Sequence, residues 1–223
     1  MKHSLFDILI KPGAFFKDAV AEKENLKIPA VIVLVLGIIS ALYAYLISGV
    51  TGKMMAGLFS GMESIITISS ALGALIGIFI FWAIWAGVFY LISSVFGGNG
   101  TYKRTLEFIG YGYLPQIFGA VLSVIVAILY LPRVVVPHLA SGAIQEDPQI
   151  LQEAIKTLMH DPAMMEMTQI ISIISIVFLL WSANIWIFGL QHSRKLSPRD
   201  AALCVGIPVV LYILYMIYTM TGV

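Results

Sequence analysis

The stretch KRTLEFIGYGYLP, residues 103–115, decides the fold because in it a charged turn becomes an apolar helix that carries its own breaker. The apolar run continues from Phe108 to Leu131 without a charged residue. At about 1.5 Å per residue, this run is long enough to cross a bilayer core of roughly 30 Å. Pro115 has no N–H, so the carbonyl of Tyr111 loses its helical partner and needs another one in lipid. The stretch therefore predicts a membrane helix that is interrupted in its first third.

The whole chain has the composition of a membrane protein. It is 60% hydrophobic and 11% charged, with a mean hydropathy of +0.96, whereas soluble domains are about 25% charged. Five apolar segments contain no Asp, Glu, Lys, Arg or His: 28–48, 65–96, 108–131, 167–190 and 201–221. We therefore predict an all-α fold, a polytopic membrane helix bundle with five transmembrane helices and short interfacial helices. Residues 28–223 would form one transmembrane domain.

The positions of the basic residues predict the orientation of the chain. Ten of the 13 Lys and Arg residues fall in three segments on one side of the membrane: 1–27, 97–107 and 191–200. The connections on the other side, 49–64 and 132–166, hold the remaining three. Basic residues are enriched on the cytoplasmic side of membrane proteins. We therefore expect a multi-pass protein of the cell membrane with a cytoplasmic N-terminus and an external C-terminus.

We predict that residues 1–27 form a cytoplasmic amphipathic segment. Pro12 suits the first turn of a short helix, in which Phe15, Phe16, Ala19 and Val20 share one face. One interpretation is an interfacial helix that lies on the membrane with these aromatic rings in the lipid. The alternative is an amphipathic segment that packs on the cytoplasmic end of the bundle.

The external connection, residues 132–166, is acidic and contains two helix-start signals. Asp147 and Asp161 each precede a proline, which places Asp at a helix cap and Pro at the first helical position. This pattern predicts a short helix against the outer face, followed by a fourth membrane helix that begins early, at Pro162.

The sequence contains no pattern typical of an enzyme or of a metal or cofactor site. No two of its four histidines have the i, i+4 spacing of a helical metal site, and a single cysteine, Cys204, excludes an intramolecular disulfide. A net charge of +1 gives no reason to expect nucleic acid binding. The spans lack the charged relay that a proton-driven pump needs. We therefore expect no catalytic residues, no metal and no cofactor.

A second interruption matches the first one in depth. Pro208 follows Asp200 by as many positions as Pro115 follows Glu107, so both breaks are expected about 12 Å along their helices. Two broken helices at one level can line a polar cavity, as in transporters; alternatively, both are kinks healed by neighbouring side chains or water. The candidate cavity or helix-break residues are Tyr111, Gly112, Tyr113, Pro115, Gly206, Pro208 and, as a deep polar group on the fourth helix, Asn184.

Short motifs resemble the Yip1 domain family. The run 112–115, Gly-Tyr-Leu-Pro, is similar to the family's signature near the inner end of the third membrane helix. Residues 12–16, the pair Ile28–Pro29 and Pro208 also resemble archaeal and bacterial members. The resemblance implies five membrane helices, a cytoplasmic N-terminus and a prokaryotic source. Eukaryotic members interact with Rab-type small GTPases through a long N-terminal region and an Asp-Leu-Tyr-Gly-Pro motif. This chain has 27 residues there and lacks the motif, which argues against a GTPase partner.

The first functional hypothesis is a non-enzymatic Yip1-type protein that organises membrane lipids or partner proteins in the membrane or the cytoplasm. A homo-oligomer is also compatible with the sequence. The candidate lipid-headgroup or partner contacts are Lys103, Arg104, Arg194, Lys195, Arg199, Phe15 and Phe16. The alternative hypothesis, from a different class, is a permeation or transport protein for ions or small solutes that uses the breaks at Pro115 and Pro208.

Overall fold

The structure, a computed structural model, describes residues 5–55, 63–137, 139 and 149–220, and helices are the regular structure found in these ranges. In chain order they are α1 (Leu5–Ile10), α2 (Pro12–Ala19), α3 (Lys27–Met55), α4 (Glu63–Val95), α5 (Tyr102–Tyr111), α6 (Leu114–Tyr130), the 3-10 turn η1 (Leu131–Arg133), α8 (Gln149–Met159), α9 (Pro162–Arg194) and α10 (Pro198–Met220). The all-α prediction is therefore confirmed.

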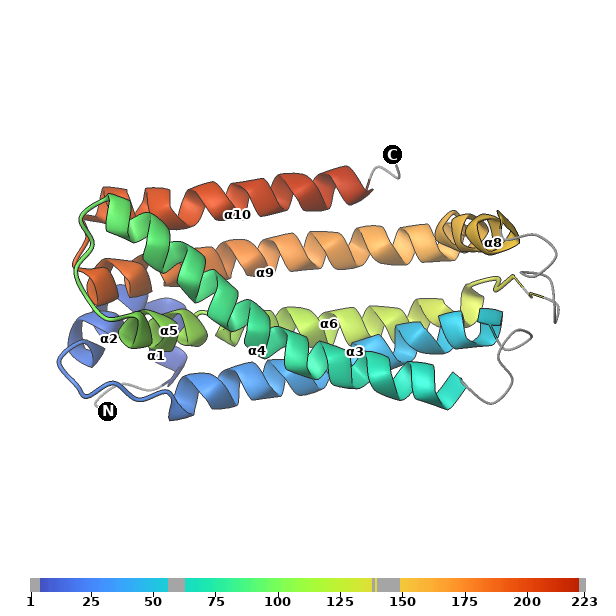
Figure 1. Ribbon diagram of the computed structural model, residues 1–223, viewed down its shortest axis with the longest axis horizontal. Helices are drawn as coiled ribbons and strands as arrows, with labels where there is room; N and C mark the ends of the chain where they lie inside the picture. Colours follow the sequence, from blue (N-terminus) through green and yellow to red (C-terminus); the bar gives the residue numbers. More distant parts are fainter. Residues whose placement is uncertain (1–4, 56–62, 138, 140–148, 221–223) are drawn as a thin grey trace.

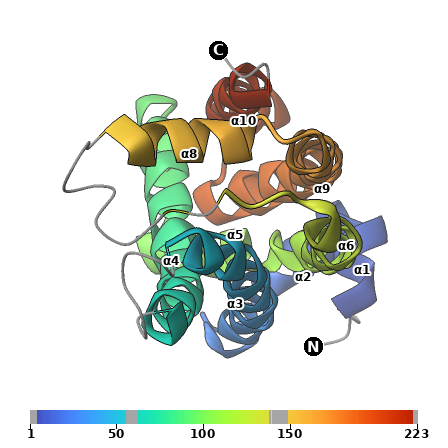
Figure 2. The ribbon, with the colours of Figure 1, turned by 90° about the vertical axis from the view of Figure 1, so that its right-hand side faces the viewer.

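Five helices are long and apolar enough to cross a membrane: α3, α4, α6 together with η1, α9 and α10. This finding confirms the five expected spans. The five helices run along the long axis of the molecule, with α4 oblique to the others (Figure 1). α1, α2 and α5 gather at one end, called here the α5 end. α8 lies across the other end, called the α8 end (Figure 2).

The third span differs from its predicted form. The sequence pattern predicts one interrupted helix from Phe108, but α5 ends at Tyr111 and a new helix, α6, begins at Leu114. Pro115 therefore stands in the first turn of α6, where a missing N–H costs little, and does not kink a continuous helix. Phe108 belongs to the second half of α5, which is buried in the protein, and the membrane-crossing part of this segment starts at Leu114.

The N-terminal segment packs on the bundle. The predicted short helix is present as α2, but Phe15 and Phe16 are buried, at 1% and 0% exposure. At Gly13 an added Cβ would lie 3.3 Å from the ring of Phe188 in α9, so the two helices are in close contact. The alternative of an amphipathic segment on the end of the bundle is the one found for α2.

The predictions for the α8 end agree with the structure where it is described. α8 packs Ala154 and Leu158 into a small apolar cluster with Val50 of α3. The carboxylate of Asp161 accepts a hydrogen bond from the backbone N–H of Met164 at 3.0 Å and caps α9, which begins at Pro162 as predicted. The helix start expected at Asp147 and Pro148 lies outside the described residues.

Most buried side chains lie toward the α5 end. The main apolar cluster joins residues of α1, α2 and α5 to all the spanning helices, and its largest fully buried members are Trp186, Phe15, Phe16, Phe89 and Phe108. Bilayer-facing surfaces carry exposed apolar side chains instead. The molecule therefore has a densely packed cap at the α5 end.

Candidate functional site

The helix break between α5 and α6 is the centre of the candidate site. Its backbone makes short-range bonds at the end of α5, from the N–H of Gly112 to the carbonyl of Ile109 at 3.0 Å and from the N–H of Tyr113 to the carbonyl of Gly110 at 3.2 Å. These tight bonds end α5 and turn the chain into α6.

Two glycines at the break allow other chain segments to approach closely. A Cβ added to Gly112 would lie 2.1 Å from Cδ1 of Trp186, and one added to Gly110 would lie 2.6 Å from Cβ of Pro29. Real Cβ atoms do not approach other heavy atoms so closely. Glycine is therefore required at both positions by the neighbours, and not by an unusual backbone conformation, since Gly112 has φ −69°.

Two indole N–H groups satisfy carbonyls near the break. Nε1 of Trp82 donates to the carbonyl of Leu106 at 2.8 Å, and Nε1 of Trp186 donates to the carbonyl of Ile109 at 2.9 Å. Both tryptophans are buried, at 6% and 1% exposure. Two carbonyls in the second half of α5 thus accept hydrogen bonds from α4 and α9, which fastens the end of α5 to both helices.

Tyr113, the residue before α6, is only partly satisfied. Its ring packs edge-on against Trp186 with centroids 5.5 Å apart, and the residue is 4% exposed. Its hydroxyl has no hydrogen-bond partner in the described structure. Tyr113 also lines a cavity of about 250 Å³ between α3, α4, α6 and α9.

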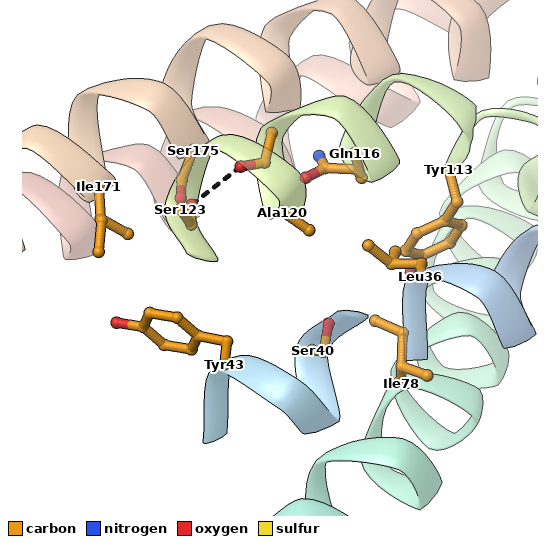
Figure 3. A pocket seen from close by; sticks show the side chains of 11 residues that line it. Leu36, Ser40, Tyr43, Ile78, Tyr113, Gln116, Ala120, Ser123, Ile171 and Ser175 are labelled. Carbon is orange, nitrogen blue, oxygen red and sulfur yellow. Dashed lines mark hydrogen bonds between the residues drawn. The ribbon is translucent and has the colours of Figure 1, made fainter. Parts of the chain in front are cut away.

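This cavity has hydrogen-bonding side chains from three helices. They are Ser40 and Tyr43 of α3, Tyr113, Gln116 and Ser123 beside or on α6, and Ser175 of α9, as Figure 3 shows. The rest of the lining consists of glycine and apolar side chains, and none of the charged residues that the structure describes contributes to it. The cavity can therefore hold an uncharged molecule, while a desolvated ion would meet no opposite charge there.

The second break lies elsewhere. α10 packs mainly on α9, and α9 stands between α10 and α6 in the end-on view (Figure 2). Pro208 is inside α10 and Gly206 has open space beside it; neither lines the cavity described above. Asn184 is exposed on α9. The structure thus brings Tyr113 to the cavity, whereas Gly112 lies against Trp186, and Gly206, Pro208 and Asn184 do not line the cavity.

Tyr111 belongs to the densely packed cap at the α5 end and not to the cavity. Its ring lies edge-on to that of Phe15, with centroids 5.2 Å apart. Burial, followed by the negative charge of Glu107, raises the pKa of Tyr111 to about 12. The hydroxyl therefore stays protonated at physiological pH.

Arg104 is part of a buried ion pair. Its Nη1 lies 3.0 Å from Oε2 of Glu107, and it also donates to the backbone carbonyls of Ala19 and Glu22. Burial raises the pKa of Glu107 to about 7, and the charge of Arg104 opposes that rise. Arg104 thus ties α5 to the segment after α2.

Arg194 holds the turn between α4 and α5. The residue is 3% exposed, and its guanidinium lies 4.0 Å from the ring centroid of Tyr90. It donates hydrogen bonds to the hydroxyls of Ser93 and Ser94 and to the carbonyls of Gly98 and Gly100. The turn between α4 and α5 is therefore fastened to the end of α9.

These contacts correct the expected surface. Of the seven candidate contact residues, Phe15, Phe16, Arg104 and Arg194 are inside the fold or bonded within it. The other three, Lys103, Lys195 and Arg199, are exposed. Lys195 adopts a left-handed backbone conformation at the end of α9. In the sequence the four buried or bonded residues stand close to charged residues, as surface residues do. Their burial could therefore not be predicted from the neighbouring sequence.

The sequence pattern did not single out α1 as an exposed apolar element. Phe6 and Ile10, four positions apart, are 64% and 62% exposed. Nε1 of Trp181, a partly exposed residue of α9, donates to the carbonyl of Leu9 at 3.3 Å. Tryptophan is enriched at membrane interfaces, and the 20 residues from Pro162 to Trp181 span about 30 Å. The i, i+4 spacing of Phe6 and Ile10 places both side chains on one face of a helix, and this spacing could have indicated the exposed apolar face from the sequence.

The all-helical fold and its five long apolar helices define a polytopic helical membrane protein. The model of the Yip1 domain matches residues 6–220. The chain belongs to the Yip1 domain family. It is also similar to the uncharacterized protein MJ0794 of Methanocaldococcus jannaschii, with 35% identity over 124 residues that cover 56% of this chain and 88% of the relative. No solved structure matches the chain.

Proposed function

We propose that this Yip1-domain protein is a non-enzymatic organiser of the membrane, which gathers anionic lipids or a protein partner at its α5 end. We place that end on the cytoplasmic side, because ten of the 13 basic residues lie in the segments that meet there. The observation that carries the proposal is the pairing of exposed Phe6 and Ile10 with exposed Lys103, Lys195 and Arg199 at one end of the molecule.

Each part of this surface has a role that follows from its chemistry. Apolar side chains beside Trp181 fit the boundary between headgroups and acyl chains. Each basic residue near an anionic leaflet contributes about 1 kcal/mol of attraction. The packed cap beneath them holds the groups in fixed positions. A small GTPase is not favoured as the protein partner, since the family motif expected for it is missing.

The test compares two sets of three basic residues at opposite ends. The protein is reconstituted in nanodiscs of mixed phosphatidylcholine and phosphatidylglycerol, and the lipids that copurify with it are quantified by mass spectrometry. Neutralising Lys103, Lys195 and Arg199 together to Gln lowers the enrichment of phosphatidylglycerol. Neutralising Lys53, Arg133 and Lys156, three exposed basic residues at the α8 end, is the matched control and leaves the enrichment unchanged. Equal enrichment in all three proteins would remove the lipid part of the proposal.

A second function, permeation of small solutes, is favoured by one observation. The cavity next to the helix break is lined by uncharged hydrogen-bonding groups at membrane depth, as a pathway for neutral solutes would be. Stopped-flow measurements on proteoliposomes, with neutral solutes and ions in separate runs, test this candidate. Absence of protein-dependent flux for every solute would retire it.

A further inference from the structure

We propose that the cavity between α3, α4, α6 and α9 is a binding site for a small uncharged polyol, a molecule of the size and chemistry of glycerol, with Tyr113 as its anchor. This inference does not rest on either proposed function, because binding requires neither lipid contact at the α5 end nor passage through the membrane.

Unpaired hydrogen-bonding groups carry the inference. The hydroxyl of Tyr113 is buried and has no partner in the described structure. Ser40, Tyr43, Gln116 and Ser175 also line the cavity, and their side chains form no hydrogen bond with another described residue. Leaving a buried polar group unpaired costs about 1–3 kcal/mol. That cost applies to the buried Tyr113 hydroxyl, and a molecule that pairs it and also bonds the partly exposed groups of the lining therefore gains binding free energy.

Comparison with other serines in the same spans shows that these hydroxyls had another option. Ser48, Ser93 and Ser123 each donate to a carbonyl of their own helix, at 3.1, 2.7 and 2.9 Å. That backbone bond is the usual way for a serine to be satisfied in a membrane helix. Ser40 and Ser175 do not form it, and both face the cavity (Figure 3).

The nature of the lining selects the class of ligand. Hydroxyl and amide groups both donate and accept hydrogen bonds, so they are best paired by ligand groups that do both, as hydroxyls do. Charged molecules would find no opposite charge. An acyl chain would leave the polar groups unpaired. The apolar side chains Leu36, Ile78 and Ile171 offer surface for the carbon chain of a polyol.

Size and access agree with this class. The cavity holds about 250 Å³, more than the roughly 150 Å³ that is enough for benzene. Ser40, Gln116 and Ser175 are partly exposed, so the cavity is open at the surface of the bundle. Its inner limit is Tyr113, whose ring rests on Trp186.

The experiment uses the full chain in nanodiscs and follows a monofluorinated glycerol analogue by fluorine NMR, with empty nanodiscs as background. The wild-type protein broadens the probe signal in a saturable way. Tyr113→Phe weakens binding about 3- to 10-fold, the range expected for one hydrogen bond. Ala120→Leu, which fills the cavity from its wall, abolishes the saturable broadening. Ser182→Ala is the matched control, since Ser182 is equally buried and unpartnered but does not line the cavity, and it binds as the wild type does.

Thermal unfolding separates loss of binding from loss of folding. Without a polyol, Tyr113→Phe unfolds no earlier than the wild type, because the Tyr113 hydroxyl forms no hydrogen bond with a residue that the structure describes. Three results would overturn the inference. One is no saturable broadening in the wild type, which leaves water as the occupant. Another is equal binding by all folded variants. The third is a fluorinated hexane that binds more tightly than the glycerol analogue and with the same affinity in the wild type and in Tyr113→Phe, which would identify an apolar ligand.

Discussion

The indole N–H of Trp186 in α9 donates a hydrogen bond to the carbonyl of Ile109 in the last turn of α5, over 2.9 Å. The same ring fills the space that Gly112 leaves free. One side chain thus satisfies the end of one helix and determines how the next one begins. The break between α5 and α6 is therefore held by a contact between residues 77 positions apart in the sequence.

Trp186→Phe removes this hydrogen bond and leaves a gap beside Gly112. We expect the free energy of unfolding to fall by about 2–3 kcal/mol, measured by thermal or detergent-induced unfolding in nanodiscs. Trp181→Phe is the matched control, because Trp181 is 38% exposed and its bond to Leu9 is longer, at 3.3 Å. Equal losses in the two variants would contradict a special role for Trp186.

Gly112→Ala places a methyl group against the indole of Trp186. Because the ring is fully buried and has nowhere to move, we expect a loss of about 2 kcal/mol or more, which lowers the unfolding temperature by several degrees. The control is Gly206→Ala, at a helical position with open space beside it; there we expect no loss, since alanine favours the helix. Tolerance of alanine at residue 112 would show that the close approach is not needed.

Arg194→Gln removes the buried cation that joins α9 to the turn after α4. Four acceptors lose a charged donor at once, and we expect a destabilisation of about 3 kcal/mol. The exposed neighbour Arg199→Gln should change the unfolding temperature by less than about 1 °C. Hydrogen exchange of residues 97–100 gives a local reading, and it should rise in Arg194→Gln alone.

Stability should fall with rising pH because of Glu107. Its pKa is raised by burial from 4.5 to about 7, so the folded protein keeps a proton between these pH values that the unfolded chain has lost. The resulting stabilisation is fully present below about pH 4.5 and is lost as pH rises through about 7. We expect the difference in stability between pH 5 and pH 8 to be larger in the wild type than in Glu107→Gln by on the order of 1–3 kcal/mol. Parallel profiles for the two proteins would contradict this assignment.

Local sequence was sufficient for the five spans because each uncharged run is about 20 residues or longer, which is the length that crosses a bilayer. Helix caps could also be predicted from local sequence, because a cap bonds its own first turn. Asp161 is an example, since its carboxylate accepts a hydrogen bond from the first turn of α9. The start of the third span was not readable. Residues 108–111 are apolar because they are buried in protein, and hydropathy does not distinguish a protein interior from lipid.

The candidate site could likewise be predicted from the sequence only in part. The sequence pattern points to Gly112, Tyr113 and Pro115, and the structure places Tyr113 on a cavity. The partners Trp82 and Trp186 stand 24 and 77 residues from their acceptors, and only the fold brings them there. Arg104 and Arg194 have the sequence context of surface charges, yet backbone carbonyls from distant turns enclose them. Their burial follows from tertiary contacts alone.

The orientation of the α5 end is the basis of the proposed function, and thiol labelling tests it most directly. In a Cys204→Ala background, single cysteines replace Lys103 at the α5 end or Lys156 at the α8 end, both of them exposed, and intact cells are treated with a membrane-impermeant maleimide. We expect Lys156→Cys to be labelled in intact cells and Lys103→Cys only after the cells are permeabilised. Labelling of Lys103→Cys from outside, with Lys156→Cys protected, would place the basic end on the wrong side of the membrane and contradict the proposal.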